Sequence, residues 1–150
     1  MQETTLLFIG PLFPVVFIMM WCSVLFAIAK FSGWSRLSEK YICRDSPPLS
    51  WKPFCSGSFG FSNYNSSLWV AFSAEGLYLK TGPLFFFRPF HPVICIPWSA
   101  IESVQEKQIF FRRGFEITVI NPRITFRLYL REFDEAERFL GKSIKRIQSK

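Results

Sequence analysis

The chain has 150 residues, of which 49% are hydrophobic and 19% aromatic, and its formal net charge is +7. Apart from Glu3, every Asp, Glu, Lys, Arg and His follows Ala29, so the remaining 10 of the 11 acidic residues share that region with all 18 Lys and Arg residues. A region of about 120 residues is the size of one domain. Its basic excess suits an anionic membrane surface, whereas no nucleic-acid-binding motif accompanies it, and we expect no nucleic-acid partner.

Residues 6–29 form a run of 24 residues without a charged side chain. As a helix this run would extend roughly 36 Å, enough to cross a hydrocarbon core of about 30 Å. We therefore expect residues 1–29 to be an N-terminal transmembrane anchor. A cleaved signal peptide is the alternative, because Ala27-Ile28-Ala29 has the small-x-small form of a cleavage site. Against it, the run is longer than a usual signal-peptide core and no Lys or Arg precedes it.

Basic residues follow the apolar run and none precedes it: Lys30, Arg36, Lys40 and Arg44. Because Lys and Arg close to a span stay in the cytoplasm, the expected topology is an outside N-terminus and a cytoplasmic domain. We expect an integral protein with one span, in a bacterial inner membrane. Outside the run there are three cysteines, Cys43, Cys55 and Cys95, and an odd number is a poor disulfide framework.

Residues 30–55 are predicted to be a juxtamembrane helix and a connector. Trp34, Leu37 and Tyr41 fall on one face of a helix spanning 33–42, which would lie at the membrane interface, at the domain edge or in the core. Three prolines indicate an irregular connector over 43–54.

Residues 56–150 are predicted to be a β domain with a C-terminal helix. Asn-, Ser- and Gly-rich stretches at 63–67, 74–76 and 114 indicate turns, and residues 97–104 lead into a strand or a short helical turn. The other strands are expected at 57–61, 68–73, 77–80, 84–87, 93–96, 109–112, 115–120 and 124–130.

The hydrophobic period changes after the last strand. Apolar residues then follow helical spacing, with acidic residues at the start and basic residues at the end: Phe133, Ala136, Leu140, Ile144 and Ile147. The predicted fold class is therefore α+β, with one N-terminal transmembrane helix followed by a small antiparallel β-barrel or sandwich that the C-terminal helix caps.

The phrases Glu75-Gly76-Leu77-Tyr78-Leu79 and Ile96-Pro97-Trp98-Ser99-Ala100-Ile101, in this order of elements, resemble pleckstrin-homology-like (PH-like) domains of the GRAM and bacterial PH type. The resemblance covers residues 58–147, and the phrase at 33–41 is similar to small membrane-anchored proteins of unknown function. It implies a β-barrel closed by a helix, and binding of phosphoinositides or proteins. The chain departs from strong phosphoinositide binders, because Asn63, Tyr64 and Asn65 stand between the first strands in place of a dense basic hairpin. An unrelated two-layer α+β domain is the alternative fold.

No enzyme signature is present in the sequence. The single histidine, His91, is expected in surface or turn packing, since no nucleophile–base pattern accompanies it. The cysteines lack a C-x-x-C spacing, and the carboxylates around residue 135 are explained as helix-start charges. We predict no catalytic residue, no cofactor and no metal.

A basic cluster is the most suggestive polar feature, and it supplies the predicted lipid- or partner-binding residues Lys107, Arg112, Arg113, Arg127 and Arg131. The alternative is an ordinary solvated face with Arg stems covering aromatic surface. The run at 85–87 is either a buried strand or an exposed apolar ridge. The predicted function is a membrane-tethered, non-enzymatic binding or scaffolding module at the cytoplasmic face, recognising a partner protein or anionic lipid headgroups. The alternatives are a structural protein that oligomerises and a secreted domain.

Overall fold

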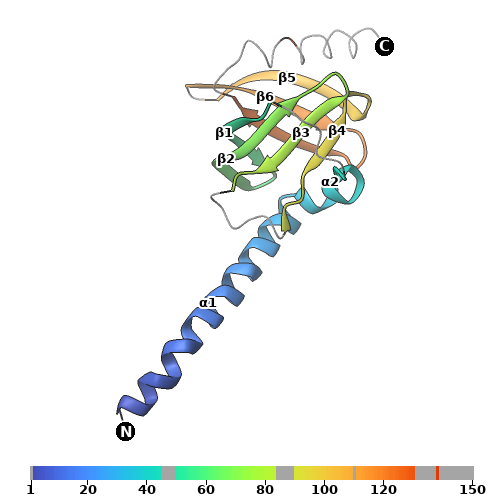
Figure 1. The fold of residues 1–150 in the computed structure, drawn as a ribbon. Coiled ribbons are helices and arrows are strands. Elements are labelled where there is room, and N and C mark those ends of the chain that lie inside the picture. Colours follow the sequence, from blue (N-terminus) through green and yellow to red (C-terminus); the bar gives the residue numbers. More distant parts are fainter. Residues whose placement is uncertain (1, 45–49, 84–89, 110, 131–137, 139–150) are drawn as a thin grey trace.

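The computed structural model describes the chain except for residues 1, 45–49, 84–89, 110, 131–137 and 139–150. It consists of one long N-terminal helix and a β domain mounted on the C-terminal end of that helix (Figure 1). The helix is α1 (Gln2–Phe31), and a short helix, α2 (Trp34–Tyr41), connects it to the sheet.

Helix α1 is apolar on every side. Its segment Leu12–Phe31 is long and apolar enough to cross a membrane, with a mean hydropathy of 2.5 and only 11% of the segment buried by the rest of the chain. A signal sequence would meet the same criteria of length and composition. Most of the large hydrophobic side chains in Leu12–Phe31 are exposed, a pattern that is unfavourable in water and normal in lipid.

Seven antiparallel strands form one curled sheet that resembles half of a barrel (Figure 1), in the order β4-β3-β2-β1-β7-β6-β5. This arrangement confirms the predicted α+β class. The elements are β1 (Lys52–Phe59), β2 (Ser62–Phe72), β3 (Gly76–Thr81), β4 (Ile94–Pro97), the single-turn helix η2 (Trp98–Ala100), β5 (Ile101–Ile109), β6 (Arg112–Val119) and β7 (Ile124–Tyr129).

The core lies on the concave side of this sheet. Side chains that alternate along β6 and β7 are buried there, as the sequence predicted: Phe115, Ile117, Val119, Ile124, Phe126 and Leu128. The ring of Phe59 on β1 stacks on that of Phe126, with centroids 4.8 Å apart. Each large side chain buried in this way contributes about 1.5–3 kcal/mol to folding.

Helix α2 closes one end of the half-barrel. Trp34 and Leu37 are fully buried in the core cluster, so the predicted helix is confirmed and its apolar face packs into the core. Gly33, with φ of 88°, lies between α1 and α2 and changes the chain direction. The indole nitrogen of Trp34 donates to the Pro92 carbonyl at 3.2 Å and thereby fixes α2 to the loop before β4.

Four local predictions were wrong. The expected strand at 109–112 does not form, because β5 ends at Ile109, Phe111 lies in a turn, and β6 begins at Arg112. The expected turn at 63–67 lies within β2, because Gly60 (φ 56°) already makes the turn and Tyr64 points into the core. Strand β1 begins at Lys52, inside the expected irregular connector. Gly114 lies within β6, where a Cβ atom would come within 2.8 Å of the Leu128 carbonyl oxygen, so this glycine permits close strand packing.

Two predicted elements fall outside the described residues. These are the strand at 84–87 and, apart from the helical residue Arg138, the C-terminal helix. Both therefore stay predictions, as do the two alternatives for the phenylalanine run at 85–87.

Candidate functional site

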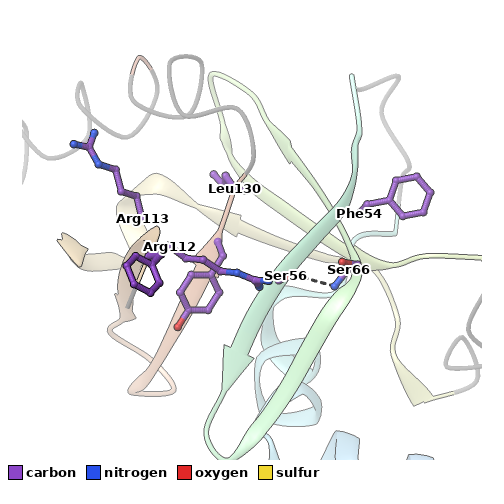
Figure 2. Close-up of a pocket in the computed structure, with 8 residues that line it drawn as sticks. Phe54, Ser56, Ser66, Arg112, Arg113 and Leu130 are labelled. Carbon is purple, nitrogen blue, oxygen red and sulfur yellow. Dashed lines mark hydrogen bonds between the residues drawn. The ribbon is translucent and has the colours of Figure 1, made fainter. Parts of the chain in front are cut away.

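A cavity of about 400 Å³ opens between the β1–β2 hairpin and the β6–β7 side of the sheet (Figure 2). We call it the distal pocket. It is lined by Phe54, Ser56, Ser66, Phe111, Arg112, Arg113, Tyr129 and Leu130. Two of the five predicted binding residues, Arg112 and Arg113, therefore lie together at one cavity.

The backbone of the distal pocket is irregular on the β1–β2 side. The pairing of β1 with β2 shifts register on both sides of Cys55, and the two residues Phe54 (φ 57°) and Ser66 (φ 50°) adopt the left-handed region. This region is uncommon for residues other than glycine, and such outliers concentrate at functional sites. The Ser66 amide donates to the Ser56 hydroxyl at 2.9 Å, which holds the two strands together at the irregularity.

Cationic and apolar groups meet at the mouth of the distal pocket. In Figure 2 the side chain of Arg112 extends along the pocket in the direction of Ser56, whereas Arg113 points away from it. Phe111, in the turn between β5 and β6, is 100% exposed, and Phe54 is 46% exposed. The pocket can therefore offer a guanidinium to a carboxylate or phosphate and aromatic surface to an apolar side chain.

Lys107 and Arg127 lie outside the distal pocket, on the outer face of the sheet, and both contact Glu116. Lys107 Nζ is 2.6 Å from Glu116 Oε1, and Arg127 Nε is 2.8 Å from Oε2. The hydrogen bond from Lys107 and then that from Arg127 lower the pKa of Glu116 below its usual range. These two cations are therefore part of a cross-strand ion-pair ladder. Arg131, the fifth predicted binding residue, lies outside the described residues.

The distal pocket is at the opposite end of the sheet from α1. A Cβ atom on Gly33, between the two helices, would lie 3.3 Å from Ile124, which pairs with Val119. Arg112 is seven residues from Val119 along β6, a span of roughly 23 Å at 3.3 Å per residue. The cavity therefore lies at the end of β6 that is remote from the C-terminal end of α1.

A second, shallower cavity of about 520 Å³ lies beside β3 and β4, near Cys43 and Cys95. The Tyr78 hydroxyl donates to Glu75 at 3.3 Å, and a hydrogen bond with Cys95 together with burial raises the pKa of Tyr78 to about 12. This phenol therefore stays protonated at neutral pH. Within the described part of the chain, no three His, Cys, Asp or Glu residues are placed to hold a metal ion.

A buried polar cluster, which sequence reasoning missed, lies where α1 meets the sheet. The Tyr64 hydroxyl is 2.9 Å from His91 Nε2 and 3.3 Å from the Ser32 hydroxyl. His91 does lie in a loop, as expected for a turn residue, but only 3% of it is exposed. Burial raises the pKa of Tyr64 to about 12, and the Ser32 hydrogen bond offsets part of this rise.

The position of this cluster favours a structural role. Trp34 packs over it, with ring centroids 5.7 Å from Tyr64 and 5.3 Å from His91, so a substrate could not reach the hydroxyl groups. No sequence signal could have located the whole cluster: Gly60 indicates a tight turn that places Phe59 and Tyr64 in one hairpin, but Ser32 and His91 are distant along the chain.

Of the cavities described above, the distal pocket is the one lined by an arginine that extends along it, two serines and the fully exposed Phe111. That combination can bind an anionic ligand with an apolar part. Its position on the sheet, at the end opposite α1, is fixed by strand register. No known protein family and no curated protein sequence matches this chain.

Proposed function

We propose that the chain is a membrane-anchored, non-enzymatic module with a PH-like domain, which captures an acidic segment of a partner protein at the cytoplasmic face. The PH-like assignment is supported by the two meanders of antiparallel strands, β1 to β4 and β5 to β7, joined through the β1–β7 pair. The binding site is the distal pocket.

An uncleaved anchor is supported by the packing at the end of α1. Leu25 and Ala29 are each only 1% exposed, although the helix around them is open, and Ile28 packs against the core cluster of the domain. Cleavage after Ala29 would remove these three residues from the folded domain. The basic residues that follow the apolar run at 6–29 are on the domain side, which favours a cytoplasmic domain: Lys30, Arg36, Lys40 and Arg44.

The observation that carries the proposal is the position of the distal pocket. An anionic membrane surface acts over a Debye length of about 8 Å at physiological ionic strength. Arg112 is roughly 23 Å along β6 from the end that meets α1, which is longer than this screening length and favours a ligand other than the headgroups around α1. A protein segment approaching from solvent can reach it.

The chemistry of the distal pocket selects among such segments. Arg112 favours carboxylates, and the fully exposed ring of Phe111 favours an apolar side chain next to it. The expected ligand is therefore a short acidic segment with at least one large apolar residue. Anchoring confines the domain to a thin layer at the membrane, so a weak contact suffices for a partner in the same layer.

The test uses the full chain in nanodiscs of zwitterionic lipid, with fluorescent peptides of alternating Glu and Leu as probes and matched peptides of Lys and Leu as negative probes. We expect the acidic peptides to bind and the basic ones not to bind, by fluorescence anisotropy. Arg112→Ser should weaken binding about tenfold or more, since a charge-assisted hydrogen bond contributes about 1.5–3 kcal/mol. The matched control is Arg123→Ser, which removes an exposed arginine paired with Glu102 outside the pocket.

Two results would overturn the proposal. One is the absence of any difference between acidic and basic peptides. The other is Arg112-dependent binding to added vesicles containing phosphatidylserine with no binding of peptides, which would identify a lipid headgroup of a second membrane as the ligand.

A further inference from the structure

Two exposed phenylalanines contact each other at the end of the domain that meets α1. Phe31, the last residue of α1, is 66% exposed, and Phe61, in the turn between β1 and β2, is 73% exposed. Their ring centroids are 6.4 Å apart. Aromatic rings so exposed on a soluble surface are unfavourable, but at a membrane–water interface they are favoured.

The β1–β2 turn is held against the end of α1 by its backbone. A Cβ atom on Gly60 would lie 3.5 Å from the Ser32 carbonyl oxygen and 3.7 Å from that of Phe31. The Ser32 hydroxyl is also 3.3 Å from that of Tyr64, two residues after the start of β2. Phe61 therefore stays at the level at which the candidate span ends.

A third phenylalanine reaches further along α1. The ring of Phe90, in the loop before β4, meets the ring of Phe26 edge-on, with centroids 5.8 Å apart. Phe26 is five residues before Phe31, which corresponds to roughly 7.5 Å along the helix axis. Lys30 Nζ lies over the same Phe26 ring, 5.7 Å from its centroid, so a cation and two aromatic rings meet at this level of α1.

We propose that this end of the β domain is inserted in the headgroup region of the bilayer, with Phe61 and Phe90 as interfacial contacts beside α1. The inference rests on the proposed membrane anchor, because the bilayer is placed by the segment Leu12–Phe31. The domain is then fixed in tilt by lipid contacts on two loops and by α1, and the distal pocket is directed away from the membrane.

The test is photo-crosslinking of the full chain in nanodiscs, with p-benzoylphenylalanine in place of one residue at a time. At Phe61 we expect crosslinks to lipid, detected as a mass increase of one phospholipid. At Phe111, which is fully exposed but at the opposite end of the sheet, we expect at least several-fold less lipid crosslinking. Position Ile18, which is 59% exposed in the middle of α1, reports on the anchor itself.

The three positions separate the possible failures. If Ile18 also fails to crosslink to lipid, the membrane anchor is wrong. If Ile18 crosslinks to lipid but Phe61 gives no more product than Phe111, the anchor stands and the interfacial docking is wrong. A crosslink from Phe61 to a second copy of the chain would also overturn the docking and assign this end of the domain to a dimer contact. Far-UV circular dichroism of each variant establishes that the fold is retained.

Discussion

Replacing Trp34 with alanine should destabilise the β domain more than any other single truncation in α2. The side chain is fully buried, its ring packs against Phe59 with centroids 5.2 Å apart, and its indole N–H is bonded to the Pro92 carbonyl. Truncating a buried Trp costs about 3–5 kcal/mol, and losing the hydrogen bond adds about 1 kcal/mol. Since single domains have about 5–15 kcal/mol of stability in all, Trp34→Ala should leave the fold marginal.

The assay is urea unfolding of the full chain in nanodiscs, followed by far-UV circular dichroism of the strands. With an m-value of about 2 kcal/mol per molar urea, a loss of about 4 kcal/mol lowers the midpoint by about 2 M. Trp34→Phe retains most of the ring and should cost about 1–2 kcal/mol. Trp21→Ala, on the exposed surface of α1, is the matched control and should leave the midpoint unchanged. Equal midpoints for Trp34→Ala and Trp21→Ala would refute the conclusion that α2 completes the core.

Three further predictions use the same urea assay. Gly76→Ala should lower the urea midpoint strongly, because its Cβ would lie 2.2 Å from the Ile96 carbonyl oxygen. The control Gly10→Ala, whose Cβ would have no atom within 4 Å, should leave the midpoint unchanged. An unchanged midpoint for Gly76→Ala would contradict the β3–β4 register. Glu116→Gln should lower the free energy of unfolding by about 1 kcal/mol at neutral pH, since both ion pairs are partly exposed. The wild type has this stability above the ordinary carboxyl pKa and loses it as the pH falls through the lowered pKa of Glu116, whereas the variant should lack it throughout. An unchanged acid profile of the variant would show that the pairs contribute nothing. Because the pKa of Tyr64 is raised to about 12, the wild type should lose stability as the pH rises from 10 towards 12, and Tyr64→Phe should lose less over that interval. Parallel profiles of stability against pH for the two proteins would place the phenol in water.

Regular periodicity made much of the fold predictable. The uncharged run became α1, the spacing of Trp34 and Leu37 became the buried face of α2, and the alternation after Phe115 became β6 and β7. Each of these patterns is local, so the sequence displays it within a few residues.

The candidate site was only partly predictable, because it depends on pairing between distant segments. Arg112 and Arg113 were found as cations near a turn, but Ser56 and Ser66 line the same cavity only through the irregular register of β1 with β2. Strand register also places Glu116 opposite Arg127, which turned an expected binding residue into part of an ion pair.

The buried polar cluster was even less predictable from the sequence. Ser32, Tyr64 and His91 are about 30 residues apart along the chain, and nothing in their neighbours indicates that they meet. A histidine between a phenylalanine and a proline is typical of an ordinary loop, and only the closed space beneath Trp34 makes it a core residue.

The connection at Gly33 joins helix α1 and the β domain without a flexible linker. The residue is left-handed, packs against Ile124, and lies between Ser32, which contacts Tyr64, and Trp34, which lies in the core. Helix α1 and the sheet are therefore rigidly connected. A rotation of α1 about its long axis, of the kind that a neighbouring membrane helix can impose, would turn the far end of the sheet through the same angle and change which way its cavity faces.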